Sequence, residues 1–171
     1  VVAIAGAATT GAELILEQQQ RALDQLDLPA GERERRVALQ QQIHEAVLSG
    51  RGWDVIPPDL RRQADTLWFE SPLEFEPRDV VEDVRQPMLF VHGALDRQVP
   101  VSHAERLAAM AREESRSRSI ELVVVPGVNH LLVPAKTGEV SEYATLSDRS
   151  VSPAVTKPIV DWLRQTFAAI R

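Results

Sequence analysis

The 171-residue sequence has no cysteine. This absence excludes disulfide bonds, thiolate metal sites and cysteine nucleophiles together. It leaves the redox compartment open, because a protein without cysteine is stable in reducing and in oxidising surroundings. Histidine does not supply an obvious metal site either, since the sequence contains neither a His-x-x-x-His nor a His-Glu-x-x-His motif. We therefore expect no bound metal.

The sequence also lacks an excess of positive charge and a long apolar run. Nineteen Lys and Arg residues stand against 25 Asp and Glu residues, for a formal net charge of −6. General electrostatic attraction to nucleic acid or to an acidic membrane is therefore not expected. No apolar stretch approaches the roughly 20 residues of a membrane span. No basic segment precedes the opening apolar run as a secretory signal requires, so we expect a cytoplasmic location.

The composition itself is that of a globular protein. Hydrophobic residues make up 44% and charged residues 26% of the chain, which argues against disorder. A single domain of this length buries roughly 70% of the surface that its unfolded chain exposes. The first residue is Val1, and both methionines, Met88 and Met110, are internal. We therefore expect the sequence to begin inside a larger fold.

Three short apolar runs predict β-strands, namely residues 1–5, 88–91 and 121–125. Each run is nearly continuous in apolar residues instead of alternating, which is typical of strands covered on both faces in a parallel sheet. A turn residue ends each run: Gly6, Gly93 and Pro126-Gly127. Helical patterns lie between and after the runs. The sequence therefore predicts an α/β fold with a three-stranded parallel sheet and flanking helices.

Two of the predicted helices have clear boundaries. In the helix between the second and third strands, Ser102 and Glu105 have the spacing of a capping box. Its expected buried stripe is Ala104, Leu107, Ala108 and Ala111. The last helix has Ser152 as its expected N-cap and Pro153 at its first position. One face of this helix should lie on the sheet through Val155, Ile159, Trp162, Leu163 and Phe167.

Residues 12–77 differ from the rest of the chain. They contain two Gln-rich runs and helical spacing of apolar residues, and turn residues divide them into about three helices. Connections inside ordinary α/β units are far shorter. We interpret this stretch as an inserted helical layer that is either a lid over a site or a decoration covering apolar surface. Its aromatic residues Trp53, Trp68 and Phe69 either line a substrate pocket or fill the core of the insertion.

Two turns at the ends of predicted strands hold the residues with the most chemical interest, within residues 90–100 and 125–130. The carboxyl ends of parallel strands share one edge of a sheet, where ligand sites collect. Asp96 and His130 could therefore meet there. The Asp96 carboxylate would accept a hydrogen bond from Nδ1 of His130, fix its tautomer, and stabilise the imidazolium formed when Nε2 takes a proton. We expect His92 to be structural or to line a cleft instead of acting as a base. We expect His44 and His103 to be exposed.

These segments together resemble the last third of an α/β-hydrolase. Residues 87–100 (PMLFVHGALDRQVP), the strand at 121–126 (ELVVVP) and residues 127–130 (GVNH) are most similar to serine aminopeptidase-like and prolyl-oligopeptidase-like esterases and peptidases. The resemblance implies that Asp96 is the acid and His130 the base of a catalytic triad. It also implies that residues 1–6 are the sixth strand, that 12–77 occupy the place of a helical cap, and that no cofactor is needed.

The sequence departs from the family pattern in one respect. The family's nucleophile is a serine in a Gly-x-Ser-x-Gly turn that precedes the acid and the base, and no such motif occurs in these residues. Residues 6–11 (GAATTG) have no serine, and they also lack the glycine and lysine pattern of phosphate-binding loops. The usual donors of an oxyanion hole are expected to be absent with the nucleophile. We therefore expect the isolated chain to be inactive.

Three hypotheses follow. In the first, the chain is the C-terminal part of one serine hydrolase domain acting on an ester or peptide substrate, completed by a missing N-terminal part. In the second, it is a non-catalytic interaction or structural domain derived from the same fold. An unpaired sheet edge would then pair with the missing part or with a second copy of the chain. The third, a small nucleotide-binding α/β protein, is disfavoured because the glycine fingerprint is absent.

Overall fold

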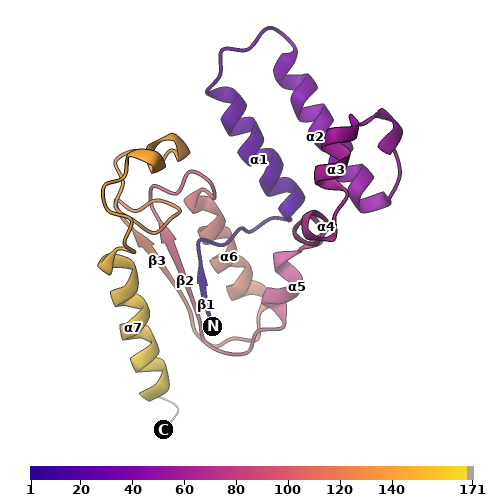
Figure 1. Ribbon diagram of the computed structural model, residues 1–171. Helices are drawn as coiled ribbons and strands as arrows, with labels where there is room; N and C mark the ends of the chain where they lie inside the picture. The colour runs from indigo at the N-terminus through magenta and orange to yellow at the C-terminus, as the bar shows by residue number, and fades with distance from the viewer. Residues whose placement is uncertain (169–171) are drawn as a thin grey trace. The chain divides into compact units, whose positions relative to one another are not determined.

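A computed structural model describes residues 1–168 of the chain (Figure 1). Its elements, in chain order, are β1 (Val2–Ile4), α1 (Gly11–Asp24), α2 (Glu32–Ser49), the 3-10 helix η1 (Trp53–Val55), α3 (Pro58–Ala64), α4 (Leu67–Glu74), α5 (Pro77–Glu82), β2 (Met88–Gly93), α6 (Val101–Glu114), β3 (Ile120–Val125), the 3-10 helix η2 (Val140–Thr145) and α7 (Pro153–Ala168). Contacts divide the chain into two compact units. The helical unit is Thr9–Glu76, and the sheet unit combines Val1–Ala8 with the residues from Pro77 on.

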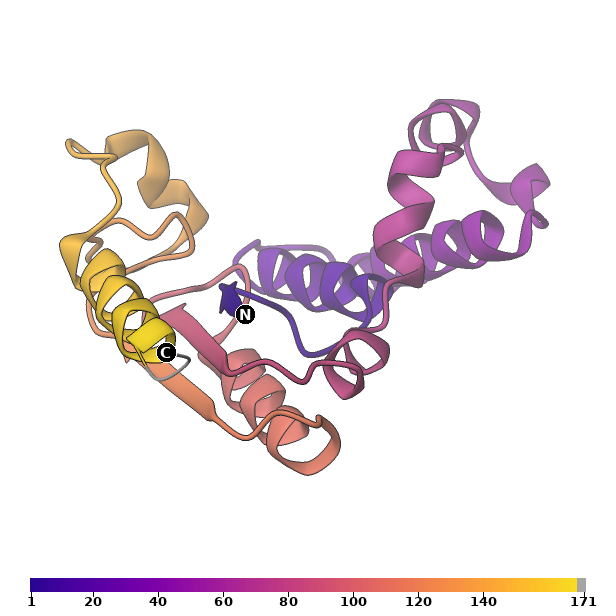
Figure 2. The same ribbon diagram turned by 90° about the horizontal axis from the view of Figure 1, so that it is seen from below.

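The sheet unit is a three-layer α/β structure. Its strands are all parallel, as the sequence predicts, and they lie in the order β1-β2-β3. Alternate residues of β2 face opposite layers, because side chains on a strand alternate between its two faces. Met88 and Phe90 pack with Leu107 of α6, whereas Leu89 and Val91 pack with α7. Figure 2 shows α6 and α7 on opposite sides of the strands.

The prediction that all three strands are covered on both faces is correct only for β2. Every residue of β2 is buried. In contrast, β1 contains no buried residue, and β3 has one, Val125. The physical reason is position, since β2 is the middle strand and the outer strands each have one strand neighbour within residues 1–168. A continuous apolar run thus indicates a strand of a parallel sheet without fixing how fully it is covered.

The helix α6 forms where predicted, but its capping box does not. The helix begins at Val101, with Pro100 as an N-cap that offers no side-chain hydrogen bond. Ser102 therefore already lies inside the helix, where its hydroxyl cannot cap the first turn. The buried stripe is confirmed for its four predicted residues: Ala104, Leu107, Ala108 and Ala111.

The helix α7 begins at Pro153, as predicted, and Ser152 Oγ accepts a hydrogen bond from the Ala154 N–H at 3.2 Å. Val155 and Trp162 are buried against the sheet, and Ile159 and Leu163 pack beside them. Phe167 is 62% exposed, so its predicted place on this face is wrong. It lies in the last turn, beyond the α7 residues that contact the sheet.

The helical unit has a core of its own. The buried residues Ile43, Ala46, Val47, Ile56, Ala64 and Leu73 form one cluster, drawn from α2, α3, α4 and the segment between η1 and α3. Trp53 and Phe69 pack against this cluster, whereas Trp68 is 83% exposed. His44 is buried against the Phe69 ring, so the expectation that it is exposed is wrong. The unit therefore does not need the sheet unit to bury its apolar residues.

The glycine at position 11, where the turn before α1 ends, is required by close packing. A Cβ atom at this position would lie 1.9 Å from the backbone oxygen of Pro72 in α4. Only glycine permits this close approach of α1 and α4. Thr10 and Glu13 then form a reciprocal capping box at the start of α1. The turn thus serves helix packing.

Two general features complete the fold. Within residues 1–168, no helix has the length and apolar character that crossing a membrane requires. The same residues contain no cluster of three or more histidine, aspartate or glutamate side chains arranged to hold a metal ion.

Candidate active site

The turns that follow β2 and β3 are joined by backbone hydrogen bonds. Gly93, the last residue of β2, pairs with Val125, the last residue of β3. The N–H groups of the next two residues, Ala94 and Leu95, donate to the carbonyls of Val125 and Val128, both at 2.9 Å. We call residues 94–100 the acid turn and residues 126–134 the base loop. The parallel register thus brings the two segments to one edge of the sheet.

Asp96 and His130 meet at this edge. The His130 Nδ1 atom lies 2.8 Å from Asp96 Oδ2. The Asp96 side chain is completely buried, and that of His130 is 30% exposed. A carboxylate acceptor at Nδ1 favours the tautomer in which Nδ1 carries the proton and Nε2 has a free lone pair. No described residue hydrogen-bonds Nε2, so this nitrogen is available for proton transfer.

The Asp96 carboxylate is held from several sides. Its Oδ1 atom accepts hydrogen bonds from the backbone N–H groups of Gln98 and Val99, at 3.0 and 2.8 Å. Burial alone would raise the pKa of Asp96, but hydrogen bonds from His130, His92 and the Val99 N–H outweigh it and lower the pKa to about 2. Asp96 is therefore ionised at neutral pH and keeps a fixed orientation toward His130.

His92 lies beside Asp96 and is fully buried. Its Nε2 atom is 2.7 Å from the Val99 carbonyl oxygen and 3.3 Å from Asp96 Oδ2. Burial alone would lower the pKa of His92, but the hydrogen bonds with Asp96 and Val99 raise it above its ordinary value. His92 is thus structural, and the alternative that it lines a cleft is wrong. The sequence indicates a structural role for His92, but it does not predict the contact of His92 with Asp96, four residues later.

The base loop is fixed by its own hydrogen bonds. The Asn129 N–H donates to the Val133 carbonyl at 3.1 Å, and the Leu132 N–H donates to the Asn129 carbonyl at 3.0 Å. Leu132 has a φ of 63°, a left-handed conformation that is uncommon outside glycine. Its carbonyl accepts a hydrogen bond from Ser152, just before α7. The loop that presents His130 is therefore tied to the following helix.

Comparison with protein-family models shows which family the chain belongs to. The model of the prolyl oligopeptidase family, an α/β-hydrolase family, matches residues 64–168, which include both Asp96 and His130. This chain belongs to the prolyl oligopeptidase family. The membership confirms the predicted resemblance and makes the chain part of a serine-hydrolase family that acts on peptides or esters. A search of curated proteins found no match.

One further prediction about histidines is wrong in this family member. His103 is only 1% exposed, although the sequence suggests an exposed residue in the first turn of a helix. Its Nδ1 atom accepts a hydrogen bond from the Ala8 backbone N–H at 3.0 Å. His103 therefore anchors the chain beyond β1 to α6. Nothing in the sequence marks this contact, because its partner is a backbone group 95 residues away.

The segment after the base loop is closed by Glu142, a residue that sequence reasoning missed. The Glu142 carboxylate accepts hydrogen bonds from the backbone N–H groups of Lys136, Thr137 and Gly138, at 2.8 to 2.9 Å. The Thr137 hydroxyl donates to it as well, at 2.7 Å. The Thr137 side chain and these backbone groups lower the pKa of Glu142 to about 2. The carboxylate thus replaces regular secondary structure as the partner of these N–H groups.

This closed segment is attached to the acid turn. Gln98 Nε2 donates to the Tyr143 hydroxyl at 3.0 Å. A Cβ atom on Gly138 would lie 1.8 Å from the Leu95 carbonyl oxygen, so the two backbones are in direct contact. The residues after His130 therefore support the turn that carries Asp96.

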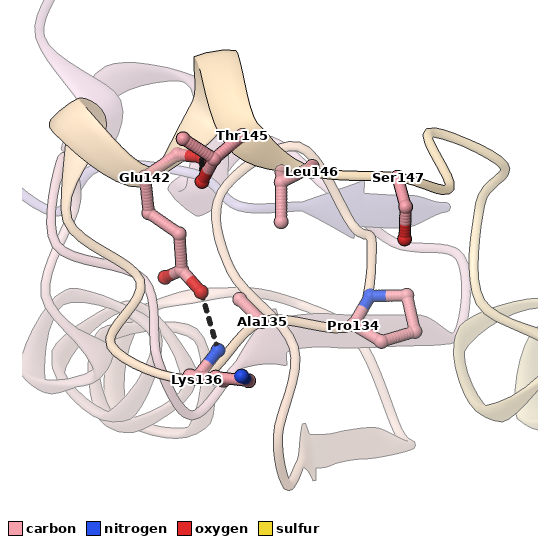
Figure 3. Close-up of a pocket in the computed structure, with 7 residues that line it drawn as sticks. All are labelled: Pro134, Ala135, Lys136, Glu142, Thr145, Leu146 and Ser147. Atoms are coloured by element: carbon pink, nitrogen blue, oxygen red, sulfur yellow. Dashed lines mark hydrogen bonds between the residues drawn. The ribbon is translucent and has the colours of Figure 1, made fainter.

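A pocket of about 370 Å³ lies in the same segment (Figure 3). It is lined by Pro134, Ala135, Lys136, Glu142, Thr145, Leu146 and Ser147. Figure 3 shows the Glu142 carboxylate directed at the Lys136 backbone nitrogen. Neither Asp96 nor His130 lines this pocket, so it is separate from the pair that could do chemistry.

Proposed function

We propose that this chain supplies the acid and the general base of a serine hydrolase that cleaves ester or amide bonds. The observation that supports this most directly is the 2.8 Å contact between Asp96 Oδ2 and His130 Nδ1, with the acid buried and the base partly exposed. Family membership supports the same reaction class.

The proposed mechanism gives each residue one role. His130 Nε2 accepts the proton of a serine hydroxyl as the serine attacks the carbonyl carbon, and it later returns that proton to the leaving group. Asp96 holds Nδ1–H, so Nε2 points at the serine, and its negative charge stabilises the imidazolium formed between the two proton transfers. This mechanism needs no metal and no cofactor.

The nucleophile is proposed to come from outside these residues. The sequence has no Gly-x-Ser-x-Gly motif, and the serine of the family's triad precedes the acid and the base in chain order. The usual oxyanion donors are the backbone N–H groups of that serine turn and of an earlier loop. We therefore propose that residues 1–171 are the C-terminal part of one α/β-hydrolase domain and are inactive alone.

Residues 12–77 are proposed to be the helical cap of this domain. The helical unit, Thr9–Glu76, buries a separate apolar cluster and so has the internal packing that a cap requires. Leu67 and Trp68 at the start of α4 are 84% and 83% exposed, whereas Leu and Trp side chains are largely buried on average. Their exposure suits contact with an apolar part of a substrate.

The test has two parts. The isolated chain should not react with a serine-directed fluorophosphonate probe, whereas a polypeptide that joins it to an N-terminal hydrolase half with a Gly-x-Ser-x-Gly turn should react. In the joined protein, Asp96→Asn should lower kcat by about 10⁴-fold and His130→Ala at least as much. Glu113→Gln, an exposed change on α6, is the matched control. Activity of Asp96→Asn within tenfold of the parent protein would remove Asp96 from the triad.

A further inference from the structure

A second histidine contacts the proposed catalytic acid. His92 stands at the end of β2, is completely buried, and takes no part in the proton transfers proposed for His130. Its Nε2 atom faces two oxygens, the Val99 carbonyl at 2.7 Å and Asp96 Oδ2 at 3.3 Å. Two such acceptors around one nitrogen require that Nε2 carry a proton, since an unprotonated nitrogen would be repelled by both oxygens.

The other ring nitrogen supports this assignment. Within the described residues, His92 Nδ1 is buried and has no hydrogen-bond partner. A buried N–H without an acceptor is destabilising, so the neutral ring keeps its proton on Nε2. The donor that faces Asp96 is thus present whether the ring is neutral or charged. The arrangement does not depend on titration of His92.

The contacts of His92 reach both ends of the acid turn. Asp96 is near the start of the turn, and its Oδ1 atom already accepts from the Gln98 and Val99 N–H groups. The His92 N–H binds the Val99 carbonyl and also lies near Oδ2, the oxygen that His130 uses. His92 therefore links the conformation of the turn to the direction of the Asp96 carboxylate.

We propose that His92 is a positioning residue for the Asp96–His130 pair. Its Nε2–H holds the acid turn closed through Val99 and shares Asp96 Oδ2 with the His130 Nδ1–H. Sharing limits how strongly Oδ2 binds His130, because two donors on one oxygen divide its available electron density. The inference rests on the proposed function for its catalytic meaning, but the hydrogen bonds that it concerns can be measured in this chain without activity.

Few ionisable groups influence the Asp96 carboxylate. The groups that act on Asp96 are His130 and His92, and Tyr143, on the closed segment, is influenced by the Asp96 charge. Tyr143 accepts a hydrogen bond from Gln98, and within the described residues no hydrogen bond joins Tyr143 to His92. A change at His92 is therefore read out most directly at the hydrogen bond between Asp96 and His130.

The experiment compares the parent chain with His92→Phe and His92→Gln by NMR at neutral pH. Phe keeps a ring but removes the donor, whereas the Gln side-chain amide can place an N–H near the Nε2 position. We expect the His130 Nδ1–H resonance to move downfield in His92→Phe, because Oδ2 loses its second donor and binds His130 more strongly. In His92→Gln it should return toward the parent position. An unchanged or upfield resonance in His92→Phe would overturn the proposal.

A measurement on the parent chain covers the case in which His92→Phe does not fold. Nitrogen NMR of the His92 ring should show a protonated Nε2 and an unprotonated Nδ1, with the Nε2 proton protected from exchange. A proton on Nδ1 and none on Nε2 would also overturn the proposal. Both measurements stand if the hydrolase activity is never found, so failure of the proposed function and failure of this inference remain distinguishable.

Discussion

At the residue scale, the hydrogen bonds of the Asp96 carboxylate fix the conformation of the acid turn. Its two oxygens receive the N–H groups of Gln98, Val99 and His130, with His92 at a longer distance. The hydrogen bonds from His130, His92 and the Val99 N–H favour the ionised form, and they lower the pKa of Asp96 more than burial raises it. The same bonds that would orient His130 for catalysis therefore also stabilise the fold.

This gives the sheet unit a defined sensitivity to acid. The pKa of Asp96 falls from 3.8 when unfolded to about 2 when folded. A depressed carboxyl pKa contributes stability that is present above pH 3.8 and is lost as the pH falls toward 2, worth about 2 kcal/mol in total. In urea unfolding followed by Trp162 fluorescence, with Trp53 and Trp68 replaced by Phe, we expect the parent chain to lose this stability between pH 4 and 2.

The comparison with Asp96→Asn isolates the effect. That variant should lack this part of the acid dependence, whereas other carboxylates, such as Glu142, continue to titrate in both proteins. Glu113→Gln, an exposed change on α6, should follow the parent chain. Equal loss of stability in the parent chain and in Asp96→Asn would show that the bonds to Asp96 do not stabilise the fold.

The residues differ in how far the sequence predicts them. Asp96 and His130 could be expected to meet, because each follows a strand of a parallel sheet and such turns share an edge. The burial of His92 and His103 could not be expected from polarity, since each is satisfied by a backbone group that only the folded chain supplies. Polar residues buried with a partner are invisible to patterns that count apolar spacing.

At the element scale, Gly93 controls the distance between the acid turn and the base loop. A Cβ atom on Gly93 would lie 2.4 Å from the Val128 carbonyl oxygen and 2.8 Å from that of Asn129. These are backbone atoms next to His130, so an added methyl group must separate the two segments. We expect Gly93→Ala to destabilise the sheet unit by a few kcal/mol and to break the contact between Asp96 and His130, visible as loss of the His130 Nδ1–H resonance.

Gly127→Ala is the matched control for this change. Gly127 lies in the base loop with a φ of 68°, and a Cβ there would meet nothing within 4 Å. Its substitution costs only the left-handed backbone strain, about 1–2 kcal/mol. The His130 resonance should therefore persist in Gly127→Ala. A Gly93→Ala variant as stable as Gly127→Ala would contradict the close approach.

In the helical unit, α2 carries its own pH-dependent residue. His44 is buried against Phe69, its Nδ1 atom has no hydrogen-bond partner within the described residues, and burial lowers its pKa below 6.5. The folded unit therefore favours neutral His44, and its stability is complete above pH 6.5 and falls as the pH drops below that value.

We expect the amide protons of α2 to exchange with solvent more readily at pH 5.5 than at pH 7.5, after correction for intrinsic exchange rates. His44→Leu should remove this difference, because leucine does not bind a proton. His130→Gln, which changes a histidine outside the helical unit, should leave the difference in α2 intact. Equal protection of α2 at both pH values in the parent chain would contradict the prediction.

The element boundaries were partly predictable. The N-cap of α7 was found because Ser152 precedes a proline, which fits the first position of a helix. The predicted capping box of α6 is wrong because Pro100 is the N-cap, so the helix begins two residues earlier than predicted, at Val101. Helix patterns thus located the stripe on α6 better than its first residue.

At the scale of the whole molecule, the chain consists of two packing units, and only one of them is continuous in sequence. The sheet unit is assembled from the first residues and those after Pro77, whereas the helical unit is continuous. The sequence indicates the insertion through its length and its change in composition. The pairing of β1 with β2, far along the sequence, could be predicted because neighbouring parallel strands are joined by a long crossover connection.

This assembly leaves β1 with an unpaired edge. β1 hydrogen-bonds β2 on one side, and within residues 1–168 no strand pairs with its other side. Unpaired strand edges bind other strands unless charge or proline blocks them. Residues 1–8 contain no charged side chain and no proline, and Val1 and Ile4 are 50% and 42% exposed. β3 also has an open edge, but it carries Glu121.

We therefore predict that the isolated chain associates with a second copy through β1, unless a separate N-terminal part of the hydrolase occupies that edge. Light scattering over a concentration series should show a mass above that of one chain. Ile4→Lys should shift the protein toward the monomer, because a charged side chain beside the edge opposes strand addition. Val124→Lys, on the exposed side of β3, is the control and should leave association unchanged. A parent chain that is monomeric at high concentration would contradict pairing through β1, and a loss of association only in Val124→Lys would move the contact to β3.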